Sequence, residues 1–158
     1  MAHNLLKYLS KMNKKGVTLL ELIIVMVIIA IGATLLAPGI GTWIPIYRLR
    51  GATRDVVSTM RTAQMKAVSI NTDYRVRFPD ATSYILEYQT TAGWVSEGTQ
   101  QTLPKGIQFS DFPPGNNFQF NPNSTASTGG LTLTNTKGST RRITLTTATG
   151  RIRVDPPL

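Results

Sequence analysis

An almost uncharged apolar run near the N-terminus constrains the fold of this chain more than any other feature. In residues 17–37, Glu21 is the only charged side chain. A helix of this length rises roughly 30 Å at about 1.5 Å per residue, which matches the hydrocarbon core of a bilayer. The sequence therefore predicts a membrane-spanning helix. A cleaved secretory signal peptide is the alternative, but the run is long for one and no small-residue cleavage site follows it.

Glu21 is the informative exception in the apolar run. A charged group in hydrocarbon costs a few kcal/mol, so a carboxylate there calls for a partner. Cleavage after Gly16 creates such a partner, because the new α-amino group of Val17 lies one helical turn from Glu21 or beside Glu21 of a neighbouring chain. Alternatively, Glu21 lies close enough to the end of the run to reach water. Both interpretations stay open.

The residues around this site carry a family resemblance. The stretch Lys14-Lys15-Gly16-Val17-Thr18-Leu19-Leu20-Glu21 joins a basic leader, a glycine, a glutamate five residues later and a long apolar helix. It resembles the prepilin signal of type IV pilins and type II secretion pseudopilins, although Val17 stands where most members have Phe. The resemblance implies cleavage after Gly16 by a prepilin peptidase, N-methylation of Val17, and a role for Glu21 in subunit registry during filament assembly.

Charge gives the expected orientation of the chain. The leader contains four lysines and no acid, so its removal leaves 13 of the 17 Lys and Arg against 8 Asp and Glu, and the net charge falls from +9 to +5. The positive-inside rule keeps the lysine-rich end in the cytoplasm. The resemblance implies a single-pass protein of the inner membrane, with its C-terminal domain in the periplasm and later in the pilus.

The residue inventory argues against an enzyme. The chain has no cysteine, and its only histidine, His3, lies in the leader. Disulfides are therefore excluded, and the commonest general base and metal ligand is absent from the mature chain. The acidic residues are scattered without metal-ligand spacing, and no phosphate-binding glycine loop follows a predicted strand. We expect no catalytic site, no metal and no cofactor.

Three segments follow from these observations: a leader over residues 1–16, a transmembrane and filament-core helix over 17–47, and a periplasmic head over 48–158. Pro38 and Pro45 are expected to kink the helix. Residues 48–71 are predicted to form an amphipathic helix. Its apolar positions step by three or four and share one face, while Arg50, Arg54 and Arg61 share another. The apolar positions are Leu49, Ala52, Val56, Met60, Ala63, Ala67 and Ile70.

After this helix the pattern changes to a period of two. Residues 74–78 and 83–88 are predicted to form a hairpin, joined through 79–82. Further short strands are predicted over 94–95, 107–109, 118–120, 131–133, 142–145 and 151–154. The Ser/Thr/Asn-rich segment 121–130 is interpreted as a mobile loop. The predicted fold class is α+β, a long N-terminal helix packed on a small antiparallel β-rich head.

The C-terminal half narrows the resemblance. Four segments are similar to the GspH and FimT branch of the family, and most similar to the FimT minor pilins. They are Phe120-Asn121-Pro122, Gly129 to Leu133, Arg141 to Leu145 and Gly150 to Val154. The helix segment 60–67 resembles the same branch. The likeness therefore covers most of the chain.

Basic residues gather in this half. Because side chains alternate along a strand, Arg151 and Arg153 point to one face, and Arg142 joins them if residues 147–150 form a hairpin turn. Arg141, Lys137 and Lys105 are expected nearby, and Asp155 is the only acid expected there. Like charges on one face repel, so an anion is favoured, and arginine matches phosphate oxygens. The sequence thus predicts contacts to the DNA backbone.

The resemblance implies the same function, because FimT-like minor pilins of naturally competent bacteria bind DNA through a Gly-Arg-x-Arg motif, here Gly150 to Arg153. The strand aromatics are predicted to pack in the core, so binding should not depend on base sequence. The expected partners are DNA, other pilins, the prepilin peptidase and the inner membrane. The alternative is a structural minor pilin or type II secretion pseudopilin that primes filament assembly without binding DNA.

Overall fold

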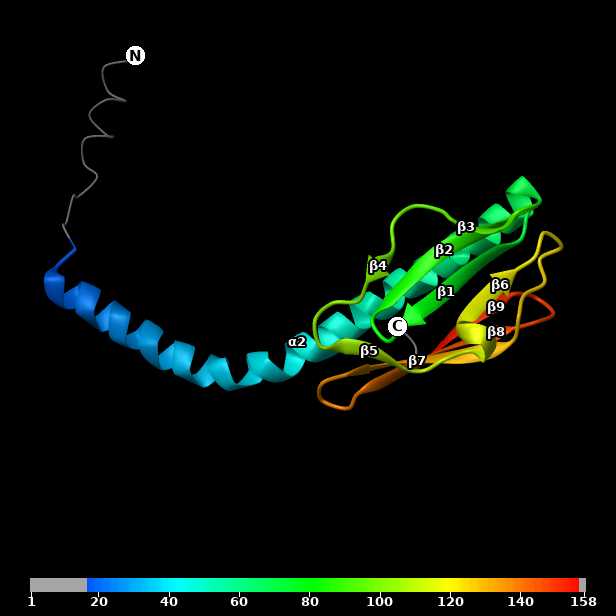
Figure 1. Cartoon of the computed structure of the whole chain (residues 1–158). Coiled ribbons are helices and arrows are strands. Elements are labelled where there is room, and N and C mark those ends of the chain that lie inside the picture. Colours follow the sequence, from blue (N-terminus) through cyan, green and yellow to red (C-terminus); the bar gives the residue numbers. More distant parts are fainter. Residues whose placement is uncertain (1–16, 157–158) are drawn as a thin grey trace, which may run out of the picture. The chain divides into compact units, whose positions relative to one another are not determined.

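The computed structural model describes residues 17–156 and, within that range, the side chains of 17–34 and 43–156. Gly16 and the rest of the predicted leader lie outside the described residues. The chain divides into two compact units, one ending at Ile40 and the other beginning at Gly41. Figure 1 shows the order of the elements, a long helix followed by short strands.

Helix α2 spans Leu19–Ile70, and Thr18 caps its N-terminus. The backbone N–H of Glu21 donates to Oγ1 of Thr18 at 3.2 Å. A threonine three residues before a glutamate is the pattern of a capping box, and a carboxylate in the first turn complements the helix dipole. Glu21 therefore has a local role in starting the helix, besides any role in assembly.

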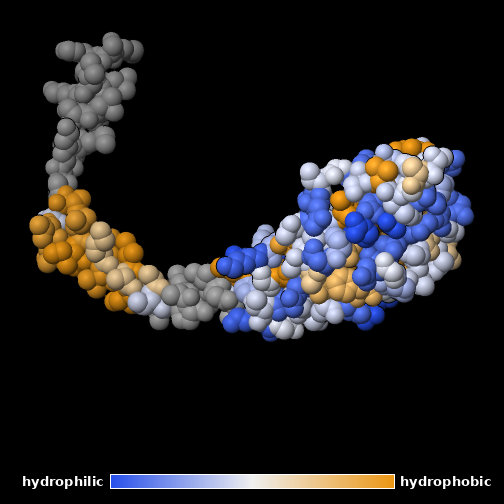
Figure 2. All heavy atoms as spheres, viewed as in Figure 1, coloured by the Kyte–Doolittle hydropathy of each residue, from blue (hydrophilic) through white to orange (hydrophobic). Residues whose placement is uncertain are grey.

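The first unit exposes apolar side chains. From Val17 to Thr34 almost every side chain is exposed, and Figure 2 shows them as a continuous apolar surface. Within the described residues, no helix is both long and apolar enough to cross a membrane. The predicted single span over residues 17–37 is therefore not confirmed by the structure.

In the second half of α2, the apolar face predicted for residues 48–71 is buried. Leu49, Val56 and Met60 are among its buried residues. Ile70 is an exception: its side chain is exposed, because the helix ends there. Asn71 adopts a left-handed conformation with φ of 55°, and the N–H of Thr72 donates to the carbonyl of Ala67 at 3.2 Å. This is the hydrogen bond of a Schellman motif, which terminates a helix.

The remaining elements form two antiparallel sheets. The first sheet has the order β3-β2-β1-β6, with β4 paired to β2, and the second has the order β5-β7-β8-β9. The strands of the first sheet are β1 (Tyr74–Asp80), β2 (Ser83–Thr90), β3 (Gly93–Ser96), β4 (Gln101–Thr102) and β6 (Asn117–Phe120). Those of the second are β5 (Ile107–Asp111), β7 (Gly129–Asn135), β8 (Thr140–Thr146) and β9 (Arg151–Asp155), and a 3₁₀ turn covers Pro114–Asn116.

The predicted α+β fold is confirmed, and each predicted strand is present. Strands β1 and β2 pair antiparallel, with Val76 opposite Leu86, so the predicted hairpin is confirmed as well. Its first strand runs to Asp80, two residues farther than predicted. Strand β4 was not predicted, because a two-residue exposed strand carries no detectable period.

One hydrophobic core joins α2 to both sheets. Phe78 of β1 stacks edge-on against Phe109 of β5, with ring centroids 5.1 Å apart, and so connects the two sheets. Every buried hydrophobic residue of the described chain lies between Leu49 and Leu145. The second unit, residues 41–158 and called the head below, therefore carries a complete core and is expected to fold without the residues before it.

The segment 121–130, predicted to be a mobile loop, makes contacts that the sequence did not reveal. The N–H of Asn121 donates to the carbonyl of Thr125 at 2.9 Å, and Ala126 is buried and bridges to Phe120. The segment is thus held by backbone hydrogen bonds and by one small core residue. Its polar composition hid both features.

Candidate nucleic-acid interface

The register of β8 and β9 places three arginines on one face. Arg142 lies opposite Asp155, Thr144 opposite Arg153, and Thr146 opposite Arg151. Directly opposed residues of antiparallel strands share a face. We call Arg142, Arg151 and Arg153, on the outer side of the second sheet, the arginine face. Its other positions on β8 are threonines.

Arg142 has an acidic partner that the sequence did not reveal. Its Nη1 lies 3.6 Å from Oδ2 of Asp111, and both side chains are about half exposed. Asp111 on β5 lies opposite Thr132 on β7, which lies opposite Arg142 on β8, so the two charges meet across the single strand β7. The expectation that Asp155 is the only acid near the arginines is therefore wrong.

Gly130 lets Arg142 lie flat on the sheet. A Cβ atom on Gly130 would come within 2.7 Å of the Nη2 atom of Arg142, which is closer than real Cβ atoms approach. Any other residue at position 130 would lift the guanidinium group off the strand. The glycine and Asp111 together fix where this arginine points.

Arg153 and Arg151 differ in their ion pairing. The Nε atom of Arg153 lies 3.2 Å from Oδ2 of Asp155, and both side chains are largely exposed. Such exposed pairs contribute only about 0 to 1 kcal/mol, so a phosphate can replace the carboxylate. Among the described residues, no salt bridge involves Arg151, whose side chain is exposed at the start of β9.

The turn before Arg151 is braced from two sides. The carbonyl of Gly150 accepts a hydrogen bond from Nε2 of Gln64 on α2 at 3.2 Å. The carbonyl of Thr147 accepts one from the N–H of Ala126 at 3.0 Å. Gly150 itself has φ of 57°, in the left-handed region that favours glycine. The glycine of the Gly-Arg-x-Arg motif thus holds the strand against the helix.

Arg141 does not join the arginine face. It alternates with Arg142, its side chain is buried, and its Nη1 donates to the carbonyl of Pro156 at 2.8 Å. Burial, together with the nearby positive charges of Arg50 and Arg54, lowers the pKa of Arg141. The structure thus gives it a place in the interior rather than at a phosphate.

Lys105 and Lys137 belong to two neighbouring loops, at the end of the second sheet away from Arg151. Lys137 belongs to the turn between β7 and β8, and Lys105 precedes β5. Their loops are joined by a hydrogen bond from the N–H of Thr136 to the carbonyl of Gly106 at 3.1 Å. Arg151 lies at the other end of the β8–β9 pair, about 20 Å away at roughly 3.3 Å per residue. The structure does not gather all the predicted basic residues at one point.

The strand aromatics mostly lie in the core, as predicted, with Trp94 as the exception. Tyr84, Phe109, Phe118 and Phe120 are buried. Trp94 is half-buried on the first sheet, where the guanidinium carbon of Arg75 lies 4.1 Å from its ring centroid. Arg75 and Arg77 also share the buried carboxylate of Glu87, at 2.7 and 2.9 Å. This cross-strand cluster was missed because it depends on pairing between distant residues.

Comparison with known proteins places the chain in a family. The pattern described as "Type II transport protein GspH" matches residues 52–150, and the "Prokaryotic N-terminal methylation motif" matches residues 11–37. No protein with a curated description matches the chain.

Solved structures of two pilus-related proteins have a similar fold. The minor pseudopilin EpsH from the type 2 secretion system of Vibrio cholerae is 16% identical, with a TM-score of 0.57, over 68% of this chain and 95% of that chain. The type IV minor pilin FimU of Pseudomonas aeruginosa is 13% identical, with a TM-score of 0.55, over 68% of this chain and 88% of that chain. At these identities the likeness shows the fold. Because the GspH pattern covers well over half of the sequence and an N-terminal methylation motif precedes it, the chain belongs to the GspH family of minor pilins and pseudopilins.

Proposed function

We propose that this protein is a minor type IV pilin that binds DNA without sequence preference, through its arginine face, during DNA uptake in natural transformation. The observation that carries the proposal is the pair Arg151 and Arg153, exposed on the same side of the edge strand β9. Membership of the family implies processing by a prepilin peptidase and association with other pilins.

The spacing of the two arginines suits a phosphate backbone. Residues two apart on a strand stand about 7 Å from each other, so each guanidinium group can meet a separate phosphate. Thr144 and Thr146, opposite them on β8, add hydroxyl donors on the same face. No aromatic residue of the described strands β7 to β9 faces this side, because these strands contain none. Base stacking and base recognition therefore have no support there, and binding follows the backbone.

The acids on the arginine face limit its affinity. Asp111 and Asp155 each neutralise one arginine in the free protein, so DNA must displace a carboxylate at Arg142 or Arg153. Contacts of this kind give micromolar or weaker binding that falls steeply with salt. Several heads in one filament would hold DNA more firmly through avidity.

The N-terminal segment supplies attachment in this proposal. Cleavage after Gly16 and methylation of Val17 would produce the mature chain. Residues 17–47 would then form the transmembrane and filament-core helix. Its apolar run, residues 17–37, would cross the inner membrane once, with residues 48–158 in the periplasm and the subunit later in the pilus. Glu21 would set the register between neighbouring subunits.

A structural role is the second candidate, and one observation favours it. Two of the three arginines on the face already have carboxylate partners, as charged residues often do on a solvent-exposed surface that binds nothing. The similar solved proteins are titled a minor pseudopilin of a secretion system and a minor pilin. In this reading the head contacts other pilins and primes filament assembly.

Replacement of both arginines in the organism that carries the gene separates the two functions. The variant Arg151→Gln/Arg153→Gln is introduced at the native locus, and protein level, surface pili and uptake of labelled DNA are measured. The proposal predicts normal protein level and normal pili with uptake reduced about tenfold or more. Loss of pili, or normal uptake with normal pili, would favour the structural role instead.

A further inference from the structure

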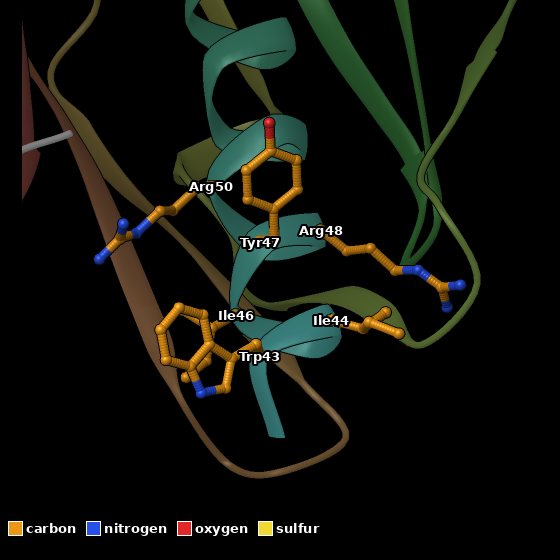
Figure 3. A pocket seen from close by; sticks show the side chains of 6 residues that line it. All are labelled: Trp43, Ile44, Ile46, Tyr47, Arg48 and Arg50. Atoms are coloured by element: carbon orange, nitrogen blue, oxygen red, sulfur yellow. The ribbon is translucent and has the colours of Figure 1, made fainter. Parts of the chain in front are cut away.

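A second exposed surface of the head lies at the start of its helix and is unrelated to the arginine face. Trp43, Tyr47, Arg50 and Arg54 follow one another at intervals of four, three and four residues, which places them along one side of α2. All four side chains are exposed, whereas Leu49, Ala52 and Thr53 between them along the helix are buried. We call these four residues the helix stripe. Figure 3 shows the first three projecting from the helix.

The two aromatic residues of the helix stripe have no role in the core. Trp43 is 76% exposed and Tyr47 is 80% exposed. Ile44 and Ile46 beside them are also exposed, and an open hollow of about 570 Å³ lies among these side chains (Figure 3). A single exposed apolar residue is ordinary on a protein surface, but a group of them marks a surface that meets something.

The two arginines of the helix stripe lack acidic partners. In the described part of the chain no salt bridge involves Arg50 or Arg54. Both lie close enough to Arg141 to oppose its positive charge. The neighbouring acid along the helix, Asp55, lines a different groove together with Tyr84. This cluster of like charges is relieved by an anion.

The order of these residues fits a bilayer surface. In sequence, Trp43 comes six residues after the apolar run ends at Ala37, and the arginines follow the aromatics. Trp and Tyr prefer the interface between hydrocarbon and water, and basic residues near the surface are attracted by anionic lipid. We propose that the helix stripe docks the head on anionic phospholipid headgroups, with Trp43 and Tyr47 in the interface and Arg50 and Arg54 on the phosphates.

The docking is distinct from DNA binding and does not depend on it. It uses different residues, and it needs only the head to approach a membrane surface. Its effect would be to hold the head in a fixed orientation at the membrane until the subunit is taken into a filament. A neighbouring pilin and DNA are the competing occupants of the same surface.

Fluorescence of Trp43 tests the docking directly. The chain has two tryptophans, so Trp94→Phe in the isolated head leaves Trp43 as the only emitter. The probes are vesicles of phosphatidylcholine alone and vesicles in which about a third of the lipid is phosphatidylglycerol. We expect a blue shift of Trp43 emission with the anionic vesicles only. Co-sedimentation of the head that retains Trp94 repeats the comparison without the substitution.

Two variants with the same change of charge locate the site. Arg50→Gln/Arg54→Gln should weaken binding to anionic vesicles by about 10- to 30-fold, since each basic residue near the surface contributes about 1 kcal/mol. Arg151→Gln/Arg153→Gln should leave vesicle binding unchanged. The second variant tests the DNA-binding proposal and the first tests the docking proposal, so failure of one is distinguishable from failure of the other.

Any one of the following results would overturn the docking proposal. These are unchanged Trp43 emission, equal binding to neutral and anionic vesicles, an equal loss of vesicle binding in the two arginine variants, and a dimer of heads that Trp43→Ala abolishes while vesicles do not bind. Loss of DNA binding in Arg50→Gln/Arg54→Gln, with vesicle binding intact, would assign the helix stripe to DNA and would also overturn it.

Discussion

Gly150 shows how one residue sets the position of the proposed DNA contact. Its left-handed conformation turns the chain into β9, and its carbonyl binds Gln64 of α2. A Cβ atom here would lie 2.6 Å from Nε2 of Gln64 and 3.1 Å from the carbonyl oxygen of Ser124. Glycine is therefore favoured here by packing as well as by backbone conformation.

Gly150→Ala should destabilise the head more than the same change at a glycine with open space around it. Gly138 is the matched control, because it also has a positive φ, of 78°, but a Cβ there meets nothing within 4 Å. Strain of this kind costs about 1–3 kcal/mol, and about 1 kcal/mol lowers the Tm of a domain of this size by roughly 4–8 °C. Thermal unfolding followed by circular dichroism measures both variants. Equal Tm values would show that the contact with Gln64 adds nothing.

Asp111 should lower the affinity of the arginine face for DNA. Asp111→Asn removes the carboxylate that faces Arg142 and leaves a third arginine available for phosphate. We expect affinity for duplex DNA at low salt to rise about two- to fivefold, the range that an exposed ion pair supports. Fluorescence anisotropy measures it, with Asp55→Asn on α2 as the control for net charge. An equal rise in both variants would mean that only net charge matters.

The face on which a site residue lies was predictable where it depends only on alternation along a single strand. Alternation along β9 is enough to pair Arg151 with Arg153, and alternation along β8 equally shows that Arg141 and Arg142 face opposite ways. Thr18 and Glu21 likewise carry a readable capping box. The contact between Asp111 and Arg142 was not predictable, because it depends on the order in which β5, β7 and β8 assemble.

Among the elements, the β1–β2 hairpin has an ionisable side chain, that of Asp80, in its turn. Hydrogen bonds from the hydroxyl of Ser83 and from the amide and hydroxyl of Thr82 hold the pKa of Asp80 below its ordinary value of 3.8. A pKa lowered by folding means that the ionised carboxylate stabilises the folded state. This contribution is present above pH 3.8 and is lost as the pH falls through the lowered pKa.

Asp80→Asn should therefore lower the Tm of the head at neutral pH and lose that effect in acid. The difference in Tm between wild type and variant is expected to stay constant down to about pH 4 and to shrink as the pH falls toward about 2. Thermal unfolding over this pH range measures the difference. A gap that stays constant at all pH values would show that the ionised form has no special role in the turn.

Elements were predictable according to their length and period. The helix and the longer strands carry clear periods of 3.6 and two, and the structure contains all of them. Strand β4 has only two residues, both exposed, so it leaves no period. In segment 121–130 the polar composition hid the backbone hydrogen bonds and the burial of Ala126, because neither depends on a periodic pattern.

In the whole molecule, the head has two separate surfaces on which exposed arginines gather. The arginine face belongs to the second sheet, and the helix stripe belongs to the start of α2. The sequence predicted the family, the fold class and the basic character of the C-terminal strand. It also put Arg50, Arg54 and Arg61 on a separate face of the helix, but it did not separate Lys105 and Lys137 from Arg151, because that separation follows from the pairing of β8 with β9.

DNA binding by the isolated head as a function of salt shows whether Arg151 and Arg153 bind DNA phosphates. A labelled duplex of about 30 base pairs is titrated with the wild-type head, with Arg151→Gln/Arg153→Gln, and with Arg50→Gln/Arg54→Gln as the control of equal charge. Two phosphate contacts predict that log K falls with log salt at a slope of about −2, and each arginine removed should reduce the slope by about one. We expect that only Arg151→Gln/Arg153→Gln, still folded, loses affinity and has a shallower salt slope. Equal binding by all three proteins, or an equal loss in both variants, would contradict it.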